Sequence, residues 1–271
     1  MKKSSMLNSL ILAALAVPGV AMAADAPASP HTFTSNIGVV SNYVFRGITQ
    51  TIGKPAVQGG FDYGHASGFY AGVWGSNVSW ITGSNTTGIT SQNNASLEMD
   101  TYAGFKNSFA TDFSYDVGVI RFNYLGDYTP PDSGLGFMYS KADTTEAYGS
   151  IGYKWISAKY SYSLGDFLTV PEAKGTNYLE INASYTLADS GVTLGAHFGK
   201  QTYKGAPADA LVAANYDPTY TDYKLSVSKD ISGYVLGLAY SDTDAKSGGY
   251  YTYNGKDWGK SAVVVSLTHA M

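Results

Sequence analysis

The chain has no cysteine, which excludes a disulfide scaffold, a thiolate zinc site and a thiol nucleophile. Charge is scarce as well: 14% of the residues are charged, whereas a soluble globular domain usually carries about 25%. Beyond residue 24, no apolar run approaches the roughly 20 residues that a membrane-spanning helix needs. Aromatic residues and glycine are abundant instead, with 23 Tyr and 31 Gly. These features together indicate β structure in an unusual solvent.

The amino terminus is typical of a secretory signal peptide. Two lysines near the start precede the apolar run Leu10–Val17, and an A-x-A cleavage site ends at Ala23. We therefore expect a signal peptide at 1–23 and a single exported domain at 24–271. The apolar run is too short to serve as a retained transmembrane anchor. The remainder is net acidic without a basic cluster, which disfavours nucleic acid as a partner.

From residue 33 onward the apolar residues alternate with polar ones, the period of a β-strand with one apolar face. The pattern predicts twelve strands, at 33–46, 56–63, 69–81, 95–106, 113–125, 144–155, 157–164, 177–187, 192–200, 219–228, 234–243 and 260–270. Short turns and longer loops rich in Gly, Pro, Asn and Asp alternate between them, as in an up-and-down meander. A meander of this size would leave two long edges exposed, so we predict an all-β, closed antiparallel barrel.

The orientation of the apolar face distinguishes a membrane barrel from a soluble one. Several apolar faces end in Tyr or Trp, as membrane-interface belts do. Strand length, strand number and loop alternation also match a transmembrane barrel. The sequence therefore favours apolar residues outward, with both chain ends in the periplasm. A soluble periplasmic barrel that binds an apolar ligand is the alternative.

Charged residues on the polar strand faces must then point into the barrel, because an ionisable group facing lipid costs several kcal/mol. The candidate pore-lining residues are Arg46, Asp62, Glu98, Asp100, Glu146, Lys159, Glu180, Asp222 and Lys224. Acids outnumber bases among them, which favours cations in an open lumen. The same charges could instead pair into a plug, and the sequence leaves both alternatives open. We expect Arg46 either to pair with Asp62 on the neighbouring strand or to bind loop carbonyls.

Two segments depart from the simple pattern. In strand 113–125 both faces carry apolar residues, which a β-bulge near Gly118 would reconcile. The run 208–214 has helical composition and is predicted to form a surface helix, with an inward constriction as the alternative.

An enzyme is the rival class. The sequence has no G-x-S-x-G, H-E-x-x-H or Walker motif, and His197 is the one histidine predicted in a strand centre. A Ser-His or Asp-His pair assembled across strands stays open, but a hydrogen-bonded lumen residue is favoured. Nothing indicates a cofactor or metal; the loop acids Asp127, Asp132, Glu172 and Asp217 lack the spacing of a calcium loop.

Several runs resemble the TorF family of proteobacterial porins. They are 41–50 (SNYVFRGITQ), 55–63, 67–78, 98–104, 159–163 and 220–225, and the run around Phe45-Arg46-Gly47 is the most specific. The resemblance spans nearly the whole chain after residue 24. It implies an outer-membrane barrel with a proposed porin function, and it implies no catalytic residues.

The sequence as a whole favours a non-enzymatic channel in a bacterial outer membrane. We expect passive diffusion of small hydrophilic solutes or ions with a mild cation preference, in contact with outer-membrane lipid and lipopolysaccharide. The alternatives are a closed barrel with a structural or loop-binding role and an outer-membrane hydrolase. The oligomeric state stays open.

Overall fold

The structure is a computed structural model that describes residues 29–83, 94–127, 129–188, 190–253 and 255–271. The predicted signal peptide lies outside the described residues. Within the described part of the chain, no helix is long and apolar enough to cross a membrane.

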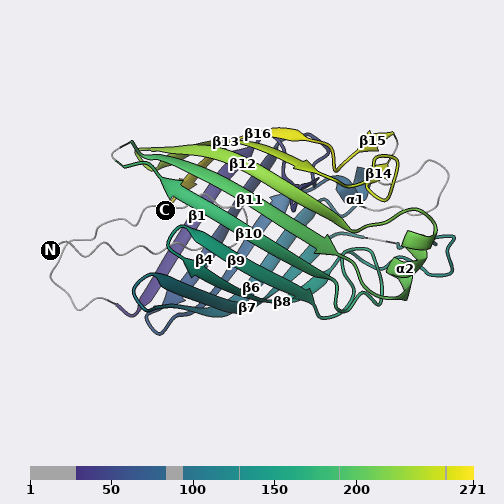
Figure 1. Cartoon of the computed structure of the whole chain (residues 1–271), viewed down its shortest axis with the longest axis horizontal. Coiled ribbons are helices and arrows are strands. Elements are labelled where there is room, and N and C mark those ends of the chain that lie inside the picture. Colours follow the sequence, from purple (N-terminus) through teal and green to yellow (C-terminus); the bar gives the residue numbers. More distant parts are fainter. Residues whose placement is uncertain (1–28, 84–93, 128, 189, 254) are drawn as a thin grey trace.

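Twelve antiparallel strands form one closed barrel (Figure 1). They are β1 His31–Val40, β4 Ala56–His65, β5 Phe69–Asn77, β6 Leu97–Phe109, β7 Phe113–Leu125, β8 Thr144–Tyr153, β9 Ile156–Ser163, β10 Asn177–Thr186, β11 Val192–Thr202, β12 Tyr220–Ile231, β13 Tyr234–Thr243 and β16 Ala262–Ala270. Each pairs with its neighbours along the chain, and β1 closes the barrel on β16 from Asn36↔Ala270 to Val40↔Ser266. The predicted fold class is confirmed.

The two ends of the barrel differ. At the turn end, β1 begins, β16 finishes and short turns join the strands. The turn between β12 and β13 has only Ser232 and Gly233 between its paired ends, with φ of 55° and 88°. Positive φ at both central residues is the type I′ geometry that matches the twist of a hairpin.

The opposite end, the loop end, carries the longer connections and the small elements. These are the hairpins β2 Val44–Phe45 with β3 Ile48–Thr49 and β14 Thr252–Tyr253 with β15 Lys256–Asp257, and the helices α1 Trp80–Gly83 and α2 Ala206–Ala213. The predicted surface helix is confirmed as α2. Its residues Ala208 and Leu211 pack against Phe167 and Tyr203 in a small hydrophobic cluster at the loop end.

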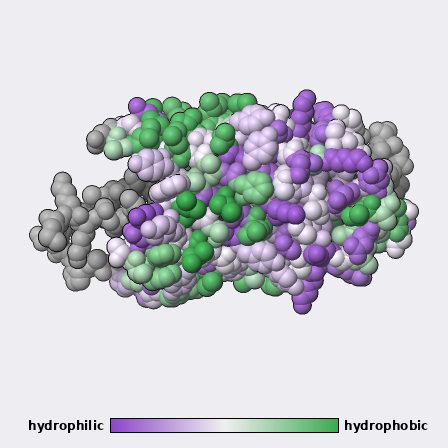
Figure 2. Space-filling model, viewed as in Figure 1, coloured by the Kyte–Doolittle hydropathy of each residue, from purple (hydrophilic) through white to green (hydrophobic). Residues whose placement is uncertain are grey.

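The outer face of the barrel wall is apolar. Along β10, Leu179 and Ile181 are each 49% exposed on the outer face. The adjacent residue Tyr178, on the inner face, is 1% exposed. Figure 2 shows hydrophobic side chains gathered over the half of the wall nearer the turn end, and hydrophilic ones over the loop end. Rings of Phe109, Phe113 and Tyr153 lie 5.4 and 4.8 Å apart along the turn end. The predicted outward orientation of the apolar face is confirmed.

Two sequence expectations about strands were wrong. The register of β7 with β6 runs unbroken from Leu97↔Leu125 to Phe109↔Phe113, so no bulge interrupts it near Gly118. Instead Ile120, Phe122 and Tyr124 point inward and are buried, because the barrel contains an apolar partner for them.

The first strand is also shorter than expected, since β1 ends at Val40 rather than at residue 46. Residues 44–49 continue the alternation, but they form the separate hairpin β2–β3. This hairpin is the apolar partner: the Phe45 and Phe122 rings lie 5.5 Å apart.

Candidate functional site

The inner face of the barrel carries the charged residues that the alternation predicts there. Each predicted lining residue lies on the buried or half-buried side of its strand, except Arg46, which belongs to hairpin β2–β3. The residues that are almost completely buried are Glu98, Asp100, Glu146 and Asp222, and the half-buried ones are Arg46, Asp62, Lys159, Glu180 and Lys224.

Hairpin β2–β3 folds into the barrel because its turn suits this sequence. Its central residues are Arg46 and Gly47, with φ of 47° and 78°, again the type I′ combination. A Cβ on Gly47 would lie 2.6 Å from Asp222 Cβ and 2.5 Å from Thr243 Cγ2, so the turn rests directly against β12 and β13. Only glycine combines this φ with so close an approach.

Arg46 holds the tip of the hairpin against the far wall. Its guanidinium donates to both oxygens of Glu146 on β8, at 2.9 and 2.7 Å, and to Gln201 Oε1 on β11 at 3.0 Å. It also lies 4.4 Å from the centre of the Tyr178 ring. Burial lowers the pKa of the Arg46 guanidinium, but the Glu146 carboxylate outweighs this and the net pKa is raised. The side chain therefore stays charged.

This geometry corrects the expected Arg46–Asp62 pair. The partner of Arg46 is Glu146, and Asp62 instead accepts a hydrogen bond of 2.6 Å from the Tyr102 hydroxyl. The reason is that Arg46 lies on a hairpin that crosses the interior, so the neighbouring strand in the sheet is not its neighbour in space.

The base of the hairpin is tied by short polar contacts. Asn42 Oδ1 accepts hydrogen bonds from the hydroxyls of Thr49 and Thr51, at 2.5 and 3.1 Å. The Tyr43 hydroxyl donates to Glu98 Oε1 on β6 at 2.9 Å. Burial, followed by the charges of Glu98 and Asp100, raises the pKa of the Tyr43 hydroxyl, so it remains a donor.

Apolar packing fills the loop half of the interior around the hairpin. One cluster joins Tyr43 and Phe45 of the hairpin segment to Trp74, Phe122 and Trp80. A second cluster brings Ile48 against Tyr220, Tyr251 and Trp258. The hairpin therefore narrows the lumen as a packed unit and not as a loose loop.

The turn half of the interior is polar. The Tyr70 hydroxyl donates to Asp116 at 2.6 Å and contacts the Tyr148 hydroxyl. Lys159 Nζ lies 4.3 Å from the centre of the Tyr148 ring. The sequence pattern did not predict that these tyrosines point inward. A tyrosine has an apolar ring and a polar hydroxyl, so it does not indicate which face of a strand is the apolar one.

His197 lies in a separate interior network. Its Nδ1 is 2.7 Å from Asn182 Oδ1, and its Nε2 is 3.0 Å from Asp222 Oδ1 and 2.9 Å from the Tyr178 hydroxyl. Glu180 completes the group, with Oε2 3.6 Å from His197 Nδ1. The inward position predicted for His197 agrees with this network, and the hydroxyl beside it belongs to a tyrosine.

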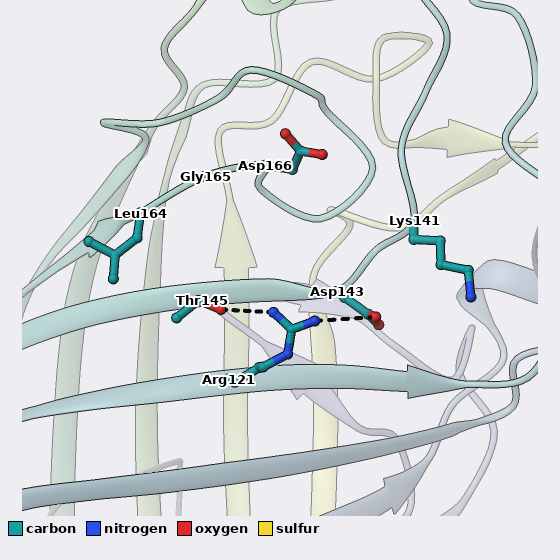
Figure 3. A pocket seen from close by; sticks show the side chains of 7 residues that line it. All are labelled: Arg121, Lys141, Asp143, Thr145, Leu164, Gly165 and Asp166. Carbon is teal, nitrogen blue, oxygen red and sulfur yellow. Dashed lines mark hydrogen bonds and ion pairs between the residues drawn. The ribbon is translucent and has the colours of Figure 1, made fainter.

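A pocket of about 530 Å³ lies on the outer face near the loop end, between β7 and the connection after β9 (Figure 3). Arg121 lies on the outward face of β7 and donates to Thr145 Oγ1 at 2.9 Å. Its guanidinium is 3.6 Å from Asp143, and Lys141 and Asp166 complete the charged lining. This pocket is separate from the barrel interior.

A closed antiparallel barrel with an apolar exterior and a charged interior is the architecture of a transmembrane β-barrel. Among solved structures, the chain is similar to a KdgM porin, with a TM-score of 0.50 and 9% identity over 88% of this chain and 98% of that one. It is also similar to a NanC porin, with a TM-score of 0.48 and 11% identity over 88% and 98%. At such identities the likeness concerns the fold.

The chain belongs to the family described as "Bacterial protein of unknown function (Gcw_chp)", whose model matches residues 24–271. No curated protein matches it. The resemblance to the TorF family stays a prediction, since the matching family carries another description.

Proposed function

We propose that this protein is a porin-like channel of the bacterial outer membrane, through which small hydrophilic solutes or ions diffuse passively. The observation that carries the proposal is the contrast between the two faces of one closed wall. Leu179 and Ile181 on β10 are exposed outward, while Glu180 between them points inward beside His197. Such a wall is soluble in lipid on its outside and in water on its inside.

The outer membrane is the location that this wall suits. Closed barrels leave no unpaired strand edge in the hydrocarbon region, and the aromatic row at the turn end matches an interfacial belt. Export would use the signal peptide expected at 1–23. The turn end would then face the periplasm and the loop end the outside, as in outer-membrane barrels generally.

A mild cation preference follows from the interior charge. The acids on the inner face are Asp62, Glu98, Asp100, Asp116, Glu146, Glu180 and Asp222, against the bases Arg46, Lys106, Lys159 and Lys224. An acidic surplus between low-dielectric walls attracts cations and repels anions. We therefore propose the interior charges as the lining of the conduction path.

A closed, plugged barrel is the second candidate, and hairpin β2–β3 is the observation that favours it. The hairpin is held by the Arg46–Glu146 pair and by packed rings such as Phe45 on Phe122. If it never leaves this position, the loops at the loop end become the functional surface. The channel and the plugged barrel therefore differ in whether ions can move past the hairpin through the barrel.

Planar-bilayer recording separates the two. The protein is purified in detergent from bacterial outer membranes, its folding is checked by the heat-dependent gel shift, and single-channel current is recorded under a KCl gradient. Discrete steps with a cation-selective reversal potential are expected. Anion-selective steps would contradict the acidic lining, and silence from folded protein would favour the plugged barrel.

We propose no catalytic role for the interior. The hydroxyl in contact with His197 is the Tyr178 phenol, which also donates to Asp222 at 2.7 Å. A hydrolytic activity of the purified protein that His197→Ala abolishes would contradict this.

Lipopolysaccharide is the lipid partner that we propose for the outer-face pocket. Arg121 and Lys141 line it at the loop end, where lipopolysaccharide phosphates would lie. Changing both to alanine is expected to reduce the lipopolysaccharide that copurifies with the barrel, measured on silver-stained gels. The double change Lys154→Ala with Lys229→Ala, both at the turn end, serves as the control with the same loss of two positive charges. Equal amounts in all three proteins would contradict this contact.

A further inference from the structure

Two carboxylates side by side on β6 differ from every other interior acid described above. Glu98 is 1% exposed and Asp100 is 0% exposed. Both oxygens of Asp100, and Oε2 of Glu98, have no hydrogen-bond partner in the described part of the chain. By contrast, Glu146 binds Arg46 and Asp222 binds Tyr178.

A buried carboxylate without a partner is expensive, because it has lost its water and gained nothing in exchange. Such a group persists when a cation or a proton neutralises it. The positive side chain above them, Arg46, is already committed to Glu146 with both terminal nitrogens. Oε1 of Glu98 accepts a hydrogen bond from the Tyr43 hydroxyl, and this leaves the charge of the carboxylate in place.

The surroundings of Asp100 suit a positive charge. Its paired neighbours in the sheet are Trp74 on β5 and Phe122 on β7. The Tyr43 ring lies 5.6 Å from Trp74, and the Phe45 ring 5.5 Å from Phe122, so hairpin aromatics continue both walls. Carboxylate oxygens and aromatic faces both attract cations, more strongly away from bulk water.

The ligand set points to the charge of the ion. Calcium usually takes six to eight oxygen ligands, and magnesium demands near-ideal octahedral geometry. No group of three or more His, Asp or Glu side chains converges as a metal site within the described residues. Two carboxylates with aromatic neighbours therefore fit a singly charged ion better than a divalent one.

We propose that Asp100 and Glu98 form an internal site for one monovalent cation, K⁺ or Na⁺, directly beneath hairpin β2–β3. As a step in conduction, this site rests on the proposed channel function. It would hold a cation beside the hairpin, so that ions pass one at a time between the polar turn half and the hairpin.

The test measures occupancy at equilibrium and without current. The purified protein in detergent is unfolded by heat, followed by tryptophan fluorescence, in mixtures of KCl and N-methylglucamine chloride at constant ionic strength. The expected result is a midpoint temperature that rises with K⁺ and saturates as for a single site. Asp100→Asn is expected to abolish the K⁺ dependence, whereas Asp209→Asn on α2, with the same change of charge, retains it.

Two outcomes would overturn the site. One is a wild-type midpoint that does not respond to K⁺ or Na⁺. The other is an Asp100→Asn protein that keeps the full K⁺ response. If Asp100→Asn does not fold, Glu98→Gln is measured in its place and must weaken the K⁺ response at least several-fold.

Failure of this site and failure of the channel are distinguishable. A K⁺-dependent midpoint in a protein that passes no current would contradict the channel and leave the cation site standing. If the protein passes current in discrete steps but its midpoint temperature does not change with K⁺, the result would contradict the cation site and not the channel.

Discussion

Replacing Arg46 by alanine tests how hairpin β2–β3 is held inside the barrel. Arg46 donates two hydrogen bonds to Glu146 and one to Gln201, and the Glu146 side chain is only 1% exposed. Arg46→Ala therefore leaves a buried carboxylate without its cation, which costs about 3–5 kcal/mol. That cost shifts the equilibrium between docked and undocked hairpin by roughly 10²- to 10⁴-fold. We expect a larger single-channel conductance and a lower temperature for the heat-dependent gel shift.

The double change Arg46→Ala with Glu146→Gln separates the charge from the contact. It leaves a neutral amide in place of an unpaired carboxylate, so the gel-shift temperature should recover in part relative to Arg46→Ala alone. Arg121→Ala, which removes a guanidinium from the outer face, should leave conductance unchanged. Wild-type conductance and wild-type heat stability in Arg46→Ala would refute the reasoning.

Two further changes test the turn and the wall. Gly47→Ala places a Cβ 2.5 Å from Thr243 Cγ2 at a residue with φ of 78°, so we expect an undocked hairpin and raised conductance; a wild-type current would contradict the close packing. Leu225→Arg puts a charge on the outer face of β12, where an arginine at the bilayer midplane costs about 2–4 kcal/mol. Less of it should fold into vesicles than of Ser228→Arg on the inner face, as measured by gel shift, and equal yields would mean that the wall is not in lipid.

Much of the fold follows from local pattern. The alternation along residues 178–187 specifies both a strand and the side that faces outward, because a one-residue slip would exchange the two faces. Short turns such as Ser232-Gly233 then fix which strands are neighbours. Neither inference needs a contact from another part of the chain, which is why both were accessible from the sequence.

The inward hairpin was not accessible in this way. Val44, Phe45, Ile48 and Thr49 have the same strand propensity whether they extend β1 or fold inward. The choice depends on residues such as Gln201 and Tyr220, which lie 155 and 174 positions from Arg46 along the chain. A local pattern carries no information about such distant contacts.

The candidate site was predictable in residue type and not in pairing. The inner-face charges could be found by alternation, but Arg46 was assigned a partner within the sheet. One signal was present: Ile120, Phe122 and Tyr124 make the inner face of β7 apolar. A β-bulge near Gly118 was the expected way to reconcile the two faces of this strand, whereas the structure shows that the inner face packs against an apolar filling.

The sequence separations around the hairpin also determine when it can assemble. Its tip contacts β8 and β11 and accepts a hydrogen bond from Tyr220 on β12, while its own segment follows the first strand. Contacts over such separations form only after the intervening chain has been ordered, because loop closure must come first. The first connection to be synthesised is therefore among the last to reach its final position. The hairpin therefore docks only after the barrel has closed. Refolding followed by the fluorescence of Trp74, which packs against Tyr43, should show a slow phase that Arg46→Ala removes.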